Sequence, residues 1–140
     1  MASLTNDGEK LVLNALFRNT GTLPTNIYVG LATNSAGSLD ETVQLADLTE
    51  VDDAGYERKE AVFTAPVING NSNEIENNAQ IEFGPWAENE DVGITYAFLC
   101  DVASGTNGIV LGLYPFSSAK MPLAGEAQII TQGSCTFSID

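Results

Sequence analysis

The sequence predicts one mainly β domain, an antiparallel β-sandwich or small barrel, with a single short helix at its N-terminus. From residue 26 onward, strand-like apolar segments recur at short spacing, and segments rich in Gly, Asn and Ser separate them. Helical periodicity occurs once, near the start of the chain. The length of 140 residues suggests a single domain over 1–140, and 44% hydrophobic against 17% charged residues supports a packed core.

The helix is expected over residues 6–18. Asn6 is a suitable N-cap, and Glu9 follows three residues later, as in a capping box. Asn19 and Gly21 are expected to end the helix. We expect it to pack on the core through one apolar face, which is formed by Val12, Leu13, Leu16 and Phe17.

Six segments are predicted to be strands because apolar residues alternate or run continuously between turn signals. The segment 93–102 is apolar on both faces, which is typical of a central strand buried on both sides. Near the C-terminus, Cys135, Phe137 and Ile139 alternate with polar residues and are expected to point inward. The six segments are 26–33, 56–65, 79–85, 93–102, 108–116 and 126–140.

Three connections carry many of the remaining polar residues. Residues 34–55 form a long polar connection whose middle, ETVQLADL, fits either a short helical turn or an additional strand. Residues 67–78 are rich in Asn and Gly and are expected to be a loop. Residues 101–108 contain many turn formers and are expected to join two neighbouring strands as a hairpin.

The charge of the chain is strongly one-sided. It has 19 acids and 5 bases, which gives a net charge of −14. Most of the acids lie between Asp40 and Asp91, so the C-terminal third is mostly neutral and apolar. A phosphate backbone or an anionic membrane is a poor partner for such a chain, because binding either of them needs a basic surface. A basic protein partner and simple solubility both remain compatible with this charge.

The residues offer little catalytic chemistry. The chain has no histidine, which removes the usual general base and the Ser-His-Asp and Cys-His arrangements. Motifs for nucleotide cradling are missing as well. We therefore predict that the protein is not an enzyme and uses no cofactor. A small acidic hydrolase, with two facing carboxylates, is kept as a third hypothesis.

Two acidic stretches contain oxygen ligands of the kind that calcium prefers. Neither stretch has the EF-hand pattern; counted from Glu50, the twelfth position is Ala61 rather than a glutamate. We interpret both as solvated acidic loops and predict no metal site, with bound calcium as the alternative. The two sets are Glu50, Asp52 and Asp53, and Glu88, Glu90 and Asp91.

The two cysteines, Cys100 and Cys135, fall inside strand-like segments. The favoured interpretation is two small buried hydrophobic residues, and a disulfide between neighbouring strands is the alternative. The first residues, MASLTNDGEK, do not resemble a signal peptide, and no apolar run has the length of a transmembrane helix. A protein made and assembled in a cytoplasm fits these features.

The segment 112–127, GLYPFSSAKMPLAGEA, is a candidate protein interface. It stays hydrophobic around two prolines, which are expected to stop the strand before it, and it also carries Lys120. Such a loop is either folded over the core or presented to a partner. Its candidate interface residues are Tyr114, Phe116, Lys120, Met121 and Leu123.

Three further residues are candidates for the same interface. Trp86 follows Gly84 and Pro85, and it fits either a large core residue or an interface anchor. Arg58 and Lys59 lie in a segment of mixed charge that suits an exposed edge strand, where they are free to meet the acids of a partner.

The order of these motifs resembles that of small structural proteins of tailed bacteriophages. The series runs LTNDGEKLVLNALF, IYVGLATNSAG, GYERKEAVF, IEFGPW, GITYAFLCDVASGTNGIVLGLY and GEAQIITQGSCTFSID, and covers most of the chain. Members of this group are described as capsid cement (decoration) proteins or as tail-fibre-like proteins. The pattern "GYxR", carried here by Gly55, Tyr56 and Arg58, is expected to be structural.

The resemblance implies a jelly-roll-like β-sandwich that coats the exterior of a capsid in the virion. As a cement protein, it would tie neighbouring major capsid proteins together and would associate with itself as a dimer or trimer. The alternative is a tail- or fibre-associated phage protein that binds a host receptor, such as a glycan. That alternative requires Trp86 to line an exposed groove with Tyr96 or Tyr114.

Overall fold

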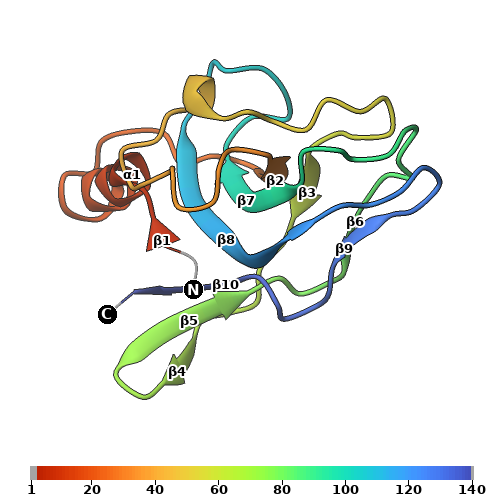
Figure 1. Ribbon diagram of the computed structural model, residues 1–140. Helices are drawn as coiled ribbons and strands as arrows, with labels where there is room; N and C mark the ends of the chain where they lie inside the picture. Colours follow the sequence, from red (N-terminus) through yellow and green to blue (C-terminus); the bar gives the residue numbers. More distant parts are fainter. Residues whose placement is uncertain (1–2, 140) are drawn as a thin grey trace.

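The computed structural model describes residues 3–139, without the side chain of Ile139. The protein is mainly β with one α-helix and antiparallel strand pairs, as the sequence predicts (Figure 1). Its elements are β1 (Ser3–Leu4), α1 (Asn6–Phe17), β2 (Ile27–Ala32), the 3₁₀ turn η1 (Leu45–Asp47), β3 (Lys59–Ala61), β4 (Val67–Asn69), β5 (Ser72–Glu76), β6 (Ile81–Phe83), β7 (Ile94–Cys100), β8 (Val110–Lys120), β9 (Gln128–Ile130) and β10 (Thr136–Ile139).

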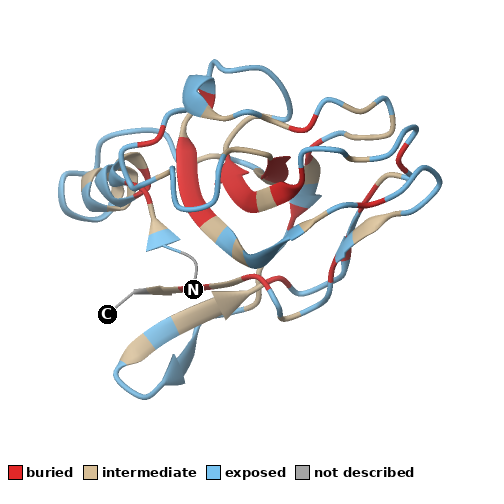
Figure 2. Ribbon diagram, viewed as in Figure 1, coloured by how far each residue is buried: buried red, intermediate tan, exposed pale blue. Residues whose placement is uncertain are grey.

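A five-stranded sheet with the order β1-β8-β7-β2-β3 forms the centre of the fold. β7 occupies its middle position and is buried on both faces apart from Thr95, which confirms the prediction of a central strand. Its side chains alternate between two apolar clusters, with Leu99 in one and Phe98 in the other. Figure 2 shows the buried residues concentrated in β7 and the first half of β8.

One face of this sheet is covered by two smaller antiparallel groups. They are the ribbon β6-β9 and the sheet β10-β5-β4. Phe83, Ile130 and Phe137 from these groups pack against Val29 and Leu31 of β2 in one apolar cluster. This arrangement is consistent with a β-sandwich, in which apolar residues of facing sheets interdigitate.

The other face is covered by the connection 34–55. Val43 and Leu45 are buried there against Phe98 and Leu113 of the central sheet. The middle of the connection forms the 3₁₀ turn η1, so the helical alternative is the right one. The connection therefore covers one face of the central sheet, although most of its residues are polar.

The helix α1 begins where the sequence predicts but has a different cap. The hydroxyl of Thr5, not Asn6, caps it by accepting a hydrogen bond from the N–H of Gly8 at 3.1 Å. The same hydroxyl donates to the carbonyl of Val110, which ties the start of the helix to β8. Thr5 is therefore both a helix cap and an anchor to the sheet.

The predicted inner face of α1 is wrong. Leu13, Leu16 and Phe17 are exposed, and Phe17 exposes 79% of its surface. The helix instead approaches β8 through Gly8, where a Cβ atom would lie only 2.3 Å from the carbonyl oxygen of Leu111. A close backbone approach needs a small residue, so this glycine turns the bulkier face of the helix outward.

β8 is longer than predicted. It continues through Pro115, which pairs with Tyr96 in register, and ends at Lys120. Within the described chain β1 pairs only with Gly112 and Leu113, so the outer side of β8 is a sheet edge from Tyr114 onward. A proline is tolerated at such an edge because its missing N–H removes no ladder hydrogen bond there. Of the two prolines in the segment 112–127, Pro115 lies within β8 and Pro122 lies beyond its end.

Residues 67–78 form strands rather than the predicted loop. β4 and β5 pair as a hairpin in which Asn69 faces Ser72 across a two-residue turn. Gly70 has a φ of 63° at the first turn position, a conformation that glycine adopts without steric cost. The Asn and Gly residues therefore mark a tight turn. The predicted hairpin across 101–108 is present, because β7 and β8 are antiparallel neighbours.

Both cysteines are buried free thiols, as the favoured interpretation expects. Cys135 and Phe137 point inward as predicted, while the side chain of Ile139 lies outside the described residues. Burial raises the pKa of the Cys135 thiol to about 11 and also raises that of Cys100.

We expect the native protein to react slowly with a thiol-specific disulfide reagent at pH 8 and to react at both cysteines once it is unfolded in urea, because the reactive species is the exposed thiolate. The free energy of unfolding should also fall as the pH rises above the ordinary thiol pKa, since the unfolded chain then ionises first. Rapid labelling of the native protein would contradict the buried positions.

Candidate functional site

The acidic segment that ends in Arg58 forms an internal junction. The guanidinium of Arg58 donates to both carboxylate oxygens of Glu50 at 2.8 and 2.7 Å, and to the carbonyls of Val102 and Gly105 at 3.1 and 3.0 Å. The Arg58 side chain exposes only 3% of its surface and lies over the Phe98 ring. The prediction that Arg58 faces a partner is therefore wrong, because its charge and donors are used inside the protein.

Tyr56 completes this junction. Its hydroxyl donates to Glu50 at 2.8 Å and accepts from the N–H of Leu31 at 2.8 Å, while its ring stacks on Phe83. Burial raises the pKa of the Tyr56 phenol well above its ordinary value. Next to it, a Cβ atom at Gly55 would lie 1.9 Å from the carbonyl oxygen of Pro85. Gly55, Tyr56 and Arg58 thus have the structural role that the resemblance implies.

Asp53 holds the turn that carries Trp86. Its carboxylate accepts hydrogen bonds from the N–H groups of Gly55, Ala87 and Glu88, at 2.7, 2.9 and 3.0 Å. The bond from Ala87 contributes most to lowering the pKa of this carboxyl. Trp86 is driven into the core and exposes 2% of its surface, so the core interpretation is confirmed and the interface interpretation is wrong. Since Tyr96 is buried as well, neither residue is available for stacking on a sugar.

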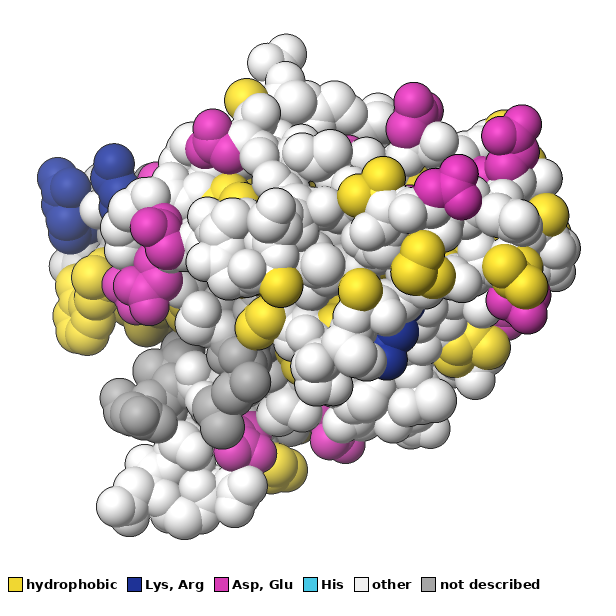
Figure 3. Space-filling model, in the orientation of Figure 1, with side chains coloured by type: hydrophobic (Ala, Val, Ile, Leu, Met, Phe, Trp, Pro, Cys, Tyr) yellow, Lys and Arg dark blue, Asp and Glu magenta, His cyan; other side chains and the backbone are white. Residues whose placement is uncertain are grey.

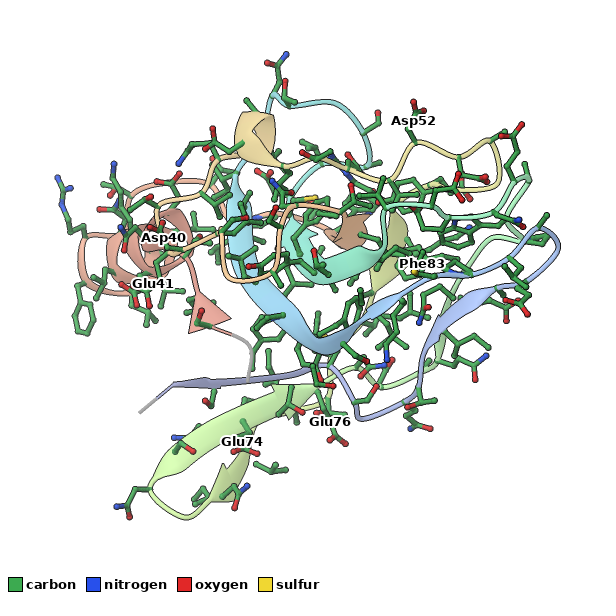
Figure 4. The ribbon with its side chains drawn as sticks, viewed as in Figure 1. Asp40, Glu41, Asp52, Glu74, Glu76 and Phe83 are labelled. Carbon is green, nitrogen blue, oxygen red and sulfur yellow. The ribbon has the colours of Figure 1, made fainter. Side chains whose placement is uncertain are left out.

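The first set of acids considered as calcium ligands, Glu50, Asp52 and Asp53, either has other partners or points away. Glu50 and Asp53 are engaged by Arg58 and by backbone N–H groups, and Asp52 points away from the body of the protein (Figure 4). Among the residues that the structure describes, no three His, Cys, Asp or Glu side chains come together as a metal site would require. The acidic stretch is a fold-stabilising junction.

Three predicted interface residues come together in a surface groove between β8 and β9, which we call the β8–β9 groove. Its volume is about 520 Å³. The Tyr114 and Phe116 rings meet edge to face at 5.8 Å, and the Lys120 ammonium lies 6.0 Å from the centre of the Phe116 ring. The groove is lined by Tyr114, Phe116, Ser117, Lys120, Gln128 and Ile129, among others.

The remaining interface candidates lie elsewhere. Met121 and Leu123 follow β8 on a loop and expose 55% and 54% of their surfaces, so they are not folded over the core. This loop is joined to residues 86–93 by a hydrogen bond from the N–H of Glu90 to the carbonyl of Pro122 at 2.9 Å. Lys59 is partly exposed in the edge strand β3 and pairs with Glu57 at 2.6 Å.

Two surface features of the protein are not predicted by its sequence pattern. Ile129 lines the groove from β9 and is 41% exposed, and the outer face of α1 is apolar. The i, i+3, i+7 spacing of Gly8, Leu11 and Ala15 was the available signal for α1. Gly8 on this face allows close packing against the sheet, Leu11 contacts the core, and Leu13, Leu16 and Phe17 remain outside.

Comparison of the sequence with protein-family models identifies the family of this chain. A family model described as podophage GP4 fiber I protein gp80 matches residues 3–138. The chain belongs to this family. Members of the gp80 family are identified as fibre proteins of a podophage, so this chain is a small structural protein of a tailed phage, and the resemblance drawn from its motif order is confirmed at that level.

The match of the gp80 family extends over nearly the whole described chain. It therefore includes both the Arg58 junction and the β8–β9 groove. The sequence matches no curated protein at a significant level. In the part of the chain that the structure describes, no helix has the length and apolar character needed to span a membrane.

Proposed function

We propose that this chain is a structural component of a phage tail fibre, which binds a neighbouring virion protein through the β8–β9 groove and performs no catalysis. The observation that carries the proposal is the match to a fibre protein family over residues 3–138. The groove supports it because it gathers the half-buried Tyr114 and Phe116 rings and the exposed Ile129 on one surface. Tail placement accounts for the family description without requiring any capsid lattice.

The groove has the composition of an interface centre. Aromatic residues such as Tyr114 and Phe116 supply much of the binding energy in protein interfaces, and Lys120 at the rim favours a partner with a carboxylate. The adjoining edge of β8 offers main-chain groups to an extended segment, which can add to the sheet as another strand. The fitting partner is an extended protein segment with apolar side chains and at least one acid.

The chemistry of the site supports a binding role over catalysis. The chain has no histidine, and the Glu50 and Asp53 carboxylates accept hydrogen bonds from Arg58 and from backbone N–H groups of the fold. A hydrolase of the carboxylate type requires an acid and a second carboxylate that both face a cleft. Glu50 instead serves Arg58 and Tyr56.

A capsid cement protein is the competing placement, favoured by the motif order. In that role the chain would bind the exterior of the shell and tie neighbouring major capsid proteins together, with multivalent contacts raising its affinity. Glycan binding by a tail protein would need exposed aromatic rings, and two of the rings expected for this role, Trp86 and Tyr96, are buried. The proposed tail role is therefore one of assembly.

The Ile129→Asp variant tests the groove. In phage grown on cells that supply the variant in place of the wild-type chain, we expect particle-bound chain to drop at least about tenfold, because a carboxylate would be desolvated at the interface centre. The thermal midpoint of the free variant should stay close to wild type, since Ile129 is partly exposed. Quantitative immunoblotting of purified particles gives the readout.

The matched control is Ile68→Asp, which places the same charge at a fully exposed residue of β4, outside the groove. It should leave incorporation unchanged. Separation of tails from heads then tests the placement: the wild-type chain is expected in the tail fraction. Recovery with tailless heads alone would overturn the fibre assignment, and normal incorporation of Ile129→Asp would overturn the role of the groove.

A further inference from the structure

The outer surface of α1 and the turn after it form an exposed apolar patch, which we call the α1 patch. Its four large side chains expose between 56% and 79% of their surfaces. Two bases, Lys10 and Arg18, flank them, and the sequence contains no acid from Lys10 to Leu39. Neither base forms an ion pair within residues 3–139. The four apolar residues are Leu13, Leu16, Phe17 and Leu23.

A second exposed apolar patch, the loop patch, consists of Val92, Met121 and Leu123, which expose 73%, 55% and 54% of their surfaces. The two loops that carry it are held together by hydrogen bonds from the N–H of Glu90 to the carbonyl of Pro122 at 2.9 Å and from the N–H of Ala124 to the Asn89 side chain at 3.0 Å. The surrounding charges are negative. The Glu126 carboxylate accepts from the N–H of Leu123 at 2.9 Å. The other nearby acids are Glu88, Glu90 and Asp91.

The two patches lie at opposite ends of the molecule. Figure 1 shows α1 at one end, and the loops that precede β7 and β9 at the other. In Figure 3, dark blue Lys and Arg side chains lie beside hydrophobic ones at the α1 end, where magenta acids also occur, and magenta acids alternate with hydrophobic side chains at the opposite end. The acids at the α1 end include Asp7 and Glu9 of the first helical turn, which precede the α1 patch in the chain. The protein thus carries two exposed apolar surfaces. The segment that carries the α1 patch has only basic charges from Lys10 onward, whereas acids surround the loop patch.

We propose that the α1 patch of one copy binds the loop patch of a second copy. Contact between two α1 patches would bring Lys10 and Arg18 against their own duplicates, and contact between two loop patches would oppose several acids. Only the cross pairing buries both apolar surfaces while it places bases against acids. The match of charge therefore identifies a second copy of this chain as the occupant.

The geometry makes this contact heterologous, head to tail. Because the patches lie at opposite ends, a pair of copies joined in this way still presents one free α1 patch and one free loop patch, so further copies can add. The contact uses no residue of the β8–β9 groove. It stands independently of the proposed attachment to another virion protein, and each can fail without the other.

Two charge-reversal variants test the contact. Lys10→Glu/Arg18→Glu alters the α1 patch, and Glu88→Lys/Asp91→Lys alters the loop patch. Sedimentation velocity over a concentration series should show self-association of the wild-type chain and at least about tenfold weaker association of each variant alone. An equimolar mixture of the two variants should associate again, because each altered patch then finds an altered patch of opposite charge and each intact patch finds its normal partner.

The matched control is Glu60→Lys/Glu82→Lys, which makes the same charge change as the loop-patch variant at two exposed positions outside both patches. Its association should equal or exceed that of wild type, since it lowers the net negative charge. A wild-type chain that remains monomeric throughout would overturn the proposal. Weakening by the α1 variant alone, with no rescue in the mixture, would also overturn it and would indicate contact between two α1 patches.

A mixed disulfide gives a second readout. Phe17→Cys copies mixed with Met121→Cys copies should form a disulfide-linked heterodimer under mild oxidation, and the native cysteines should not interfere because both are buried. Phe17 and Met121 are both exposed, so each substitution should leave the thermal midpoint near wild type. Links that form only between two Phe17→Cys copies would contradict the head-to-tail contact.

Discussion

Replacing Arg58 by leucine is expected to lower the free energy of unfolding by about 3 kcal/mol. The change removes four hydrogen bonds at once, two to the Glu50 carboxylate and two to the carbonyls of Val102 and Gly105. Glu50 would then remain largely inside the protein without its counter-charge, although its 29% side-chain exposure admits some water. Urea denaturation monitored by Trp86 fluorescence gives the measurement.

The neighbouring ion pair provides a matched control. Lys59 and Glu57 lie 2.6 Å apart, close to the 2.7 Å of Arg58 and Glu50, but the Glu57 side chain is 73% exposed. Lys59→Leu should leave the urea midpoint unchanged, because exposed ion pairs contribute little. Equal losses in the two variants would contradict the structural role of Arg58. The double variant Arg58→Leu/Glu50→Leu should recover part of the loss, since no unpaired charge remains.

Gly55→Ala is expected to cost about 2 kcal/mol or more of unfolding free energy. The added Cβ atom would lie 1.9 Å from the carbonyl oxygen of Pro85, a backbone atom that cannot move alone. Relief of this overlap would displace the turn that Asp53 holds and that places Trp86 in the core. We therefore expect the variant to show a lower urea midpoint and a red-shifted native Trp86 emission.

Ala54→Ser is the control for this prediction. It changes the exposed residue immediately before Gly55 and adds a single oxygen at the surface. Both the midpoint and the Trp86 emission should match wild type. A Gly55→Ala protein with wild-type stability and emission would show that the segment 53–55 does not press against the 85–88 turn.

The elements that depend on local periodicity were predictable. The sequence of β7 is a nearly continuous apolar segment because this strand is buried on both faces. The inner face of α1 was not predictable from hydrophobicity, because the close approach at Gly8 depends on the position of Leu111, more than a hundred residues away. The β4–β5 hairpin was missed because its strands are short and largely polar, so the turn residues dominate the pattern.

In the candidate site, too, the features set by local sequence were predictable and those set by long-range contacts were not. Tyr114, Phe116 and Lys120 were predicted as one surface because they lie close together in the chain, and the structure places them in one groove. Arg58 was assigned to an exposed edge because its segment has mixed charge, and Trp86 fitted either the core or an interface. Their environment depends on partners elsewhere in the chain, such as Glu50 and Gly105 for Arg58 and Asp53 for the turn that carries Trp86. Long-range pairing of this kind leaves no periodic signal in a sequence.

The proposed function and the proposed contact between copies together give the protein a role in assembly. Its rigid junction around Arg58 is internal, whereas its groove and both patches lie on the surface. Under these two proposals, three separate surfaces serve one contact with a neighbouring protein and two contacts with further copies of the chain. Separate contact surfaces suit a repeated structural component, because simultaneous contacts raise the overall affinity through multivalency.

Cryo-electron microscopy of the native particle tests the central claim most directly. The proposed function predicts density for this chain in the tail fibres, with the β8–β9 groove occupied by a segment of a neighbouring protein. Density for the chain on the outer capsid shell, and none in the tail, would contradict the fibre assignment and would favour a cement protein.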